Sequence, residues 1–201
     1  MSTTLVIDTA TAACSVALLD GDRIVAAIHE VVGRGHAERL VPMIAELPGG
    51  GRADAVLVDC GPGSFTGLRV GIAAAIGLGI GWGVPVAGYS SMTLVAAAAF
   101  ADHADWSQLA VVLEGGHGEV FMQAFDRPTA PAGALASLSP EAALAALDGR
   151  PAIGSGVKYL GSGTEALPDA ARAILLPDPL RALPPRPIYG RAPDAKVPQR
   201  A

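Results

Sequence analysis

Apolar and polar positions divide the start of the chain into three short apolar runs. These runs cover residues 4–8, 13–19 and 23–30, and each has the length of a strand. Asp20-Gly21 between the second and third runs is a tight hairpin turn. The pattern predicts three successive strands that form an antiparallel meander.

The period changes to that of a helix over residues 36–47, where Leu40, Ile44 and Leu47 share one face. Pro42 lies inside this helix, so we expect a bend or a late start. A strand at 54–59, a helix at 66–82, a strand at 85–87 and a helix capped by Ser90 or Ser91 and ending near residue 101 follow. The order of elements predicts an α/β fold.

The second half has a weaker pattern. It predicts strands at 109–113 and 118–125, a helix near 140–148 and a strand near 152–154. Beyond Pro177 the many prolines, among them Pro193 and Pro198, predict an extended tail. We therefore expect an N-terminal lobe over residues 1–103, and a smaller, degenerate second lobe with this tail over residues 104–201.

Composition and charge narrow the class of protein. Hydrophobic residues make up 51% of the 201 positions and charged residues 16%, which predicts a sizeable core rather than disorder. The net charge is −5 and no Lys/Arg cluster is present, so we expect any RNA to be held mainly by another subunit. Cys14 and Cys60 lie at or beside apolar runs and predict buried free thiols in a reducing cytoplasm.

A glycine-rich turn from Cys60 to Ser64 joins a predicted strand to a long helix. Free backbone N–H groups at such a helix start can receive a phosphate. The alternative is a tight connection in which Ser64 or Thr66 caps the helix. The segment Asp8-Thr-Ala-Thr11 also has two interpretations. Its carboxylate and hydroxyls can bind a metal-bound phosphate, or its side chains can form hydrogen bonds with their own backbone. The nucleotide-binding candidates are Asp8, Thr9, Gly61, Gly63 and Ser64.

Small residues recur every four positions along the helix at 66–82, at Gly67, Gly71, Ala75, Gly79 and Gly83. Each glycine costs a helix about 1 kcal/mol relative to alanine, and close packing can offset that cost. The stripe packs either within its own lobe or against a helix of a second chain. The run from Val70 to Gly88 is nearly all apolar, but Pro85 and five glycines within it argue against membrane insertion.

The sequence offers few residues that could support catalysis by this chain alone. The four histidines, His29, His36, His103 and His117, form no His-x-x-x-His pair, and no nucleophile elbow is recognisable. We therefore predict no catalytic residue and no metal ligand, and expect the chain not to be an enzyme. A peptidase would need a nucleophile or a metal that the sequence does not offer.

Several segments together carry a resemblance to a family. Asp8–Thr11, Gly35-His-Ala-Glu-Arg-Leu40 and above all Gly61-Pro-Gly-Ser-Phe-Thr-Gly-Leu-Arg-Val-Gly71 resemble the TsaB (YeaZ) family, the accessory subunits of bacterial tRNA threonylcarbamoyladenosine biosynthesis. The resemblance implies an actin/Hsp70-like ATPase (ASKHA) fold: two lobes, each with a mixed sheet flanked by helices, the second reduced. In the catalytic paralogue a metal-binding His-x-x-x-His follows a Val-Pro strand. The corresponding places here hold about Ser91 and Val95.

The resemblance further implies a heterodimer with a TsaD-like catalytic subunit, joined by a TsaE-like ATPase, with tRNA reached only through the complex. The chain alone would need no cofactor, ATP or ADP would bind at the complex interface, and an exposed apolar face predicts a homodimer when the chain is alone. An autonomous ATP-dependent phosphotransferase of the same fold is the alternative. The family's pairing surface uses the first two helices, which places the partner interface here on His36, Leu40, Ile44, Thr66, Gly67, Val70, Gly71, Ala74, Ala75, Leu78 and Gly79.

Overall fold

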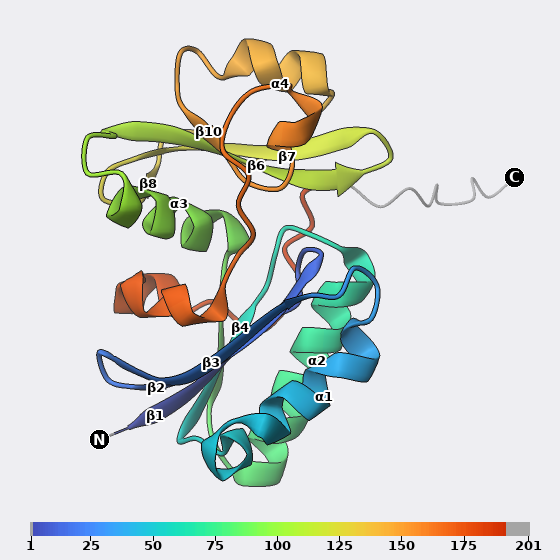
Figure 1. Ribbon diagram of the computed structural model, residues 1–201, viewed down its shortest axis with the longest axis vertical. Helices are drawn as coiled ribbons and strands as arrows, with labels where there is room; N and C mark the ends of the chain where they lie inside the picture. Colours follow the sequence, from blue (N-terminus) through green and yellow to red (C-terminus); the bar gives the residue numbers. More distant parts are fainter. Residues whose placement is uncertain (1, 192–201) are drawn as a thin grey trace, which may run out of the picture.

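The computed structural model describes residues 2–191 and contains two mixed sheets, one above the other in Figure 1. The first sheet has the order β3-β2-β1-β4-β5. Its strands are β1 (Thr3–Asp8), β2 (Ala13–Asp20), β3 (Arg23–Val31), β4 (Ala55–Asp59) and β5 (Val86–Tyr89). The predicted antiparallel meander of β1, β2 and β3 is confirmed, and β4 and β5 run parallel to β1.

Helices cover both faces of this sheet. Helices α1 (His36–Glu46) and α2 (Phe65–Trp82) pack on one face, together with the turn η1 (Pro48–Gly51) between α1 and β4. The opposite face carries α3 (Ser91–Asp102) and the 3-10 helix η3 (Ala170–Leu175). Because β1 and β4 have helices on both sides, their apolar residues form a continuous run rather than an alternating one.

The second sheet has the order β10-β6-β7-β8, with β9 also paired to β7. Its strands are β6 (Gln108–Gly116), β7 (Glu119–Asp126), β8 (Ala130–Pro131), β9 (Ala136–Leu138) and β10 (Ala152–Ile153). Helix α3 lies between the two sheets, and α4 (Pro140–Ala146) packs on the outer face of the second sheet (Figure 1). The 3-10 helix η2 (Val157–Tyr159) packs on that outer face too.

The expectations about proline are wrong in two places. Helix α1 begins at His36 and continues through Pro42, so the late start is wrong, while the bend stays a prediction. The ring displaces one helical hydrogen bond, that to the Glu38 carbonyl, and both residues are exposed, so water can bond that carbonyl. Residues just after Pro177 are not extended: Asp178–Arg181 form the 3-10 helix η4, with a proline in its first turn, where no amide donor is needed. Residues 192–201, with Pro193 and Pro198, lie outside the described part.

The end of the described chain returns to the first sheet. Ala170, Ala173 and Leu176 are buried against its strands, and Leu183 bonds to Gly88 of β5. The expected division into residues 1–103 and 104–201 stays a prediction. The packing adds that part of the later segment contributes to the core of the first sheet.

Candidate functional site

Two turns meet at the carboxyl ends of β1 and β4, because these strands are parallel neighbours. The amide N–H of Ser64 donates to the carbonyl of Ala10 at 2.6 Å, and the Thr9 hydroxyl donates to the carbonyl of Gly67 at 2.8 Å. A Cβ atom at Gly63 would overlap the Ala10 carbonyl. The turn after β1 and the glycine turn after β4 are therefore closed on each other, and glycine is required at position 63 for this approach.

Two carboxyl groups lie beneath these turns. Asp8 and Asp59 end β1 and β4, and both are buried. Burial raises the pKa of Asp8, and burial together with the charge of Asp8 raises the pKa of Asp59 well above its ordinary value. Both carboxyls accept further hydrogen bonds from their own turns, the Ala10 N–H to Asp8 and the Gly61 N–H to Asp59.

The five nucleotide-binding candidates therefore differ in whether a ligand could reach them. Asp8, Thr9 and Gly61 are buried and bonded within the protein, whereas Gly63 and Ser64 line an open cleft. The Ser64 side chain accepts from the Gly67 N–H and caps α2. The interpretation of this turn as a tight, capped connection is confirmed. Phosphate binding at its remaining amides stays a prediction.

The cleft separates the turns of the first sheet from the β6–β7 hairpin of the second and has a volume of about 1460 Å³. Its cationic lining includes Arg34 and Arg69, which form no salt bridge within residues 2–191. Lys158, by contrast, pairs with Glu114 at 2.9 Å. A cleft of this size can hold a nucleotide-sized molecule.

An aromatic cluster stands at the rim of this cleft. The guanidinium of Arg69 lies 3.5 Å from the centre of the Phe65 ring and donates to the Tyr189 hydroxyl at 3.3 Å. The two rings, with centroids 6.1 Å apart, are both more than half exposed. The sequence marked Phe65 as part of the glycine motif, but nothing in the spacing brought Tyr189 to it.

The glycine stripe of α2 faces inward, which corrects part of the predicted partner interface. A Cβ atom at Gly67 or Gly71 would overlap Thr9, and one at Gly79 would overlap the Val86 side chain. Ala75 is buried with them, and so are His36, Leu40 and Ile44 of α1. The glycines let the backbone of α2 approach the sheet closely, and the buried residues of α1 pack in the core on the same face. Of the predicted interface, Thr66 is exposed, and Val70, Ala74 and Leu78 are half-buried.

The outward face of α2 is apolar instead. Ala73, Ile76, Gly77, Ile80 and Gly81 are exposed, and residues 70–82 contain no charged side chain. Helix α2 is long and apolar enough to cross a membrane by length and composition, the one such helix in residues 2–191. A third of it is buried within the protein, where its stripe packs on β1 and β5.

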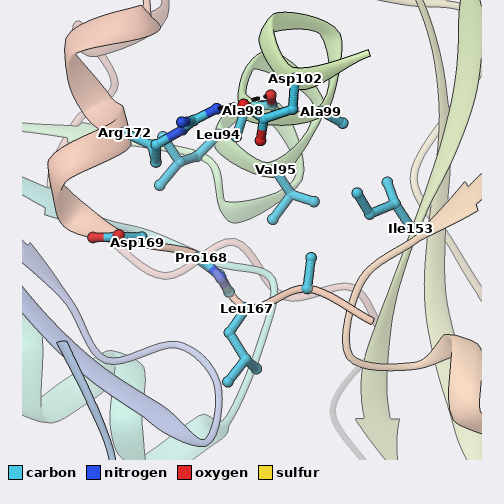
Figure 2. Close-up of a pocket in the computed structure, with 11 residues that line it drawn as sticks. Leu94, Val95, Ala98, Ala99, Asp102, Ile153, Leu167, Pro168, Asp169 and Arg172 are labelled. Atoms are coloured by element: carbon cyan, nitrogen blue, oxygen red, sulfur yellow. Dashed lines mark hydrogen bonds and ion pairs between the residues drawn. The ribbon is translucent and has the colours of Figure 1, made fainter. Parts of the chain in front are cut away.

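A smaller cavity of about 210 Å³ lies between α3 and the segment that enters η3. Figure 2 shows Val95 of α3 and Ile153 of β10 on one side of it and the segment that carries Leu167 and Pro168 on the other. The ion pair between Arg172 and Asp102 closes one end. The cavity is below the size range of most ligand pockets, so we assign it no function.

Metal ligands are not assembled anywhere in the described part of the chain: residues 2–191 hold no group of three His, Cys, Asp or Glu side chains placed for an ion. His36 is buried against the Ala13 carbonyl and His103 stacks on Trp106. His29 lies 4.0 Å from Asp169, and His117 is in the β6–β7 turn.

Comparison with known proteins identifies the family of the chain. The family described as "TsaD: tRNA N6-adenosine threonylcarbamoyltransferase" matches residues 26–142, more than half of the chain. The crystal structure of an uncharacterized protein with similarity to peptidase YEAZ from Pseudomonas aeruginosa superimposes with a TM-score of 0.78 and 31% identity. The match covers 95% of this chain and all of that one. The chain belongs to the TsaB/YeaZ family. The ASKHA fold that the resemblance implied is confirmed.

Two curated relatives are tRNA threonylcarbamoyladenosine biosynthesis proteins TsaB. The Haemophilus influenzae protein is 45% identical over half of this chain and 44% of its own length. The Escherichia coli protein is 38% identical over 61% of this chain and 54% of its own length. The chain thus spans about half the length of these TsaB relatives.

Proposed function

We propose that the chain is a non-catalytic subunit of the cytoplasmic complex that makes N6-threonylcarbamoyladenosine in tRNA. In this proposal it docks to a TsaD-like transferase and acts with a TsaE-like ATPase, and tRNA is reached through the complex. The family and the TsaB names of its relatives support the pathway. The observation that carries the docking role is the apolar outward face of α2.

That face is unusual for a surface helix. Ile80 is 78% exposed and Ile76 39% exposed, and no charged side chain accompanies them on the last thirteen residues of α2. A Cβ atom added at Gly77 or Gly81 would meet nothing within 4 Å in residues 2–191 apart from its own stretch of helix. Each of these glycines costs the helix about 1 kcal/mol, and the described part of the chain offers no packing contact that offsets the cost. A partner packed against this face supplies that contact.

Helix α1 extends the face and gives it a polar border. Val41 of α1 is 63% exposed, and α1 contacts α2. On the other side of α1, Arg39 bonds both Glu30 and Glu46 at 2.6 Å. An apolar centre beside a polar rim is the usual composition of a protein–protein interface. The same face supports pairing of two copies when the partner is absent.

The non-catalytic part of the proposal rests on the closed turns. An autonomous phosphotransferase needs a carboxylate that reaches the nucleotide, and Asp8 and Asp59 are buried and bonded to neighbouring groups. We keep ATP or ADP at the complex interface as a second proposal. Its support is the cleft beside Ser64, with two arginines that have no carboxylate partner within residues 2–191.

The experiment is a sizing-column assay with the TsaD-like protein of the same organism. Ile80→Glu places a charge at the centre of the face, so we expect it to abolish the complex and leave the fold intact. Leu144→Glu is the matched control: Leu144 is 48% exposed on α4, away from α1 and α2, and its complex should be unchanged. A wild-type chain that forms no complex, or a complex that survives Ile80→Glu, contradicts the proposal.

Loss of the gene provides the functional readout. Cells without the chain should lose the modified nucleoside, and wild type but not Ile80→Glu should restore it. Purified chain alone should leave tRNA unmodified. Modification by the isolated chain would instead favour an enzyme.

A further inference from the structure

The two buried carboxyls beneath the turns lie side by side. Asp8 and Asp59 directly follow the paired residues Ile7 and Val58 of two neighbouring parallel strands, with 0% and 1% of their surface exposed. Two ionised carboxylates are acceptors only and cannot bond each other. A hydrogen bond between these two neighbours would therefore require a proton on one of them.

The groups that hydrogen-bond to the pair are neutral donors. The Tyr89 hydroxyl of β5 donates to Asp8 at 2.8 Å, and the Ser91 hydroxyl of α3 donates to Asp59 at 2.6 Å. Cys60 stands beside Asp59, and burial raises the pKa of its thiol to about 11, so it is neutral at pH 7.

Cationic groups do not neutralise the pair. Neither carboxyl has a salt bridge within residues 2–191. Burial is the largest influence on the pKa of Asp8 and raises it, whereas the charge of His29 on β3 lowers that pKa and is the smallest influence. Two buried negative charges without a cation would be strongly unfavourable.

We propose that Asp8 and Asp59 share one proton in the folded protein at neutral pH, and that this bridge holds the two turns together in place of a bound cation. A nucleotide-binding member of this fold would need open carboxylates at these strand ends. Here the pair is sealed beneath bonds from Ser64 to Ala10 and from Thr9 to Gly67. The residues present do not fit a metal–nucleotide site at this position. The inference is independent of the docking role.

The first test is the pH dependence of unfolding by urea. The folded chain holds a proton that the unfolded chain releases above the ordinary Asp value of 3.8. The contribution of this proton to stability is therefore fully present below the ordinary Asp pKa and is lost as pH rises toward the folded pKa of the pair. One such proton changes the folding equilibrium constant about tenfold per pH unit in this window.

Asp59→Asn is the informative variant. Its amide donates permanently to Asp8 and still accepts from Ser91 and Gly61, so this part of the slope should disappear. Asp22→Asn is the control, because Asp22 is an exposed carboxyl in the β2–β3 turn, remote from the pair. It should keep the slope.

The second test is infrared spectroscopy of the full chain in D₂O at pH 7. Wild type should show the carbonyl band of a protonated carboxyl, and Asp8→Asn and Asp59→Asn should lack it. Absence of the band in wild type overturns the proposal, even if the variants fail to fold. Equal pH slopes in wild type and Asp59→Asn also overturn it. So does stabilisation of wild type by Mg²⁺ that Asp59→Asn lacks, because a cation would then hold the pair.

Discussion

The two faces of helix α2 are built from the same kinds of residue and differ in what they contact. The inward face presents Gly67, Gly71 and Gly79 at points where any side chain would overlap Thr9 or Val86. The outward face presents Gly77 and Gly81, which meet nothing, beside exposed isoleucines. Small residues on the first face permit the fold. On the second face they make no close approach to another element of residues 2–191.

This difference shows why a stripe of small residues cannot be assigned to a partner from its spacing alone. Glycines four residues apart define a face, but not what lies against it. Bulky substitutions at Gly71 or Gly79 would therefore damage the core before they reported on docking. Substitutions on the outward face separate the two effects.

Gly67→Ala should give the largest effect. The new Cβ would overlap the backbone carbonyl of Thr9, whose hydroxyl also bonds the Gly67 carbonyl. Backbone at the end of β1 can move little, so we expect a loss of about 3 kcal/mol in the free energy of unfolding. Urea denaturation measures it. A loss below about 0.5 kcal/mol would mean that α2 does not pack on Thr9 as described.

Ile80→Ser should act on association rather than stability. If two copies pair through the outward face, we expect the dissociation constant of the homodimer to rise at least about tenfold, which is roughly 1.4 kcal/mol. Sedimentation equilibrium measures this change. The unfolding free energy of the monomer should stay within about 0.5 kcal/mol of wild type, because the side chain is 78% exposed. An unchanged dimer would place self-association elsewhere.

Much of the fold follows from local pattern. The apolar runs that predict β1, β2 and β4 are buried strands, and the helical period after Gly35 gives α1. The sequence did not predict η3, because Ala170–Leu175 has no helical period of its own. It forms where Ala170 and Ala173 fill space between the first sheet and α3. The conformation of this segment therefore depends on the sheet and the helix around it, and not on its own sequence pattern.

The candidate site was less predictable for a similar reason. Asp8 and the glycine turn stood out in the sequence, whereas Asp59 was only the end of a predicted strand and Ser91 a possible helix cap. Tyr89 lay beyond the predicted strand and had no assigned role. Their bonds to one another join residues more than thirty positions apart, which the parallel pairing of β1, β4 and β5 brings together. A motif marks a turn, but the sheet decides which side chains meet beneath it.

Gly77→Ala should give the smallest effect and the sharpest comparison of the two faces. Its Cβ would lie in open space, so the helix should gain about 1 kcal/mol in the free energy of unfolding of the isolated chain. If the partner packs closely against α2, the same methyl group should weaken the complex. Urea denaturation and calorimetric titration with the partner give the two values. Greater stability with unchanged docking would mean that Gly77 does not contact the partner, and would confine the docking centre to Ile76, Ile80 and their neighbours on α1.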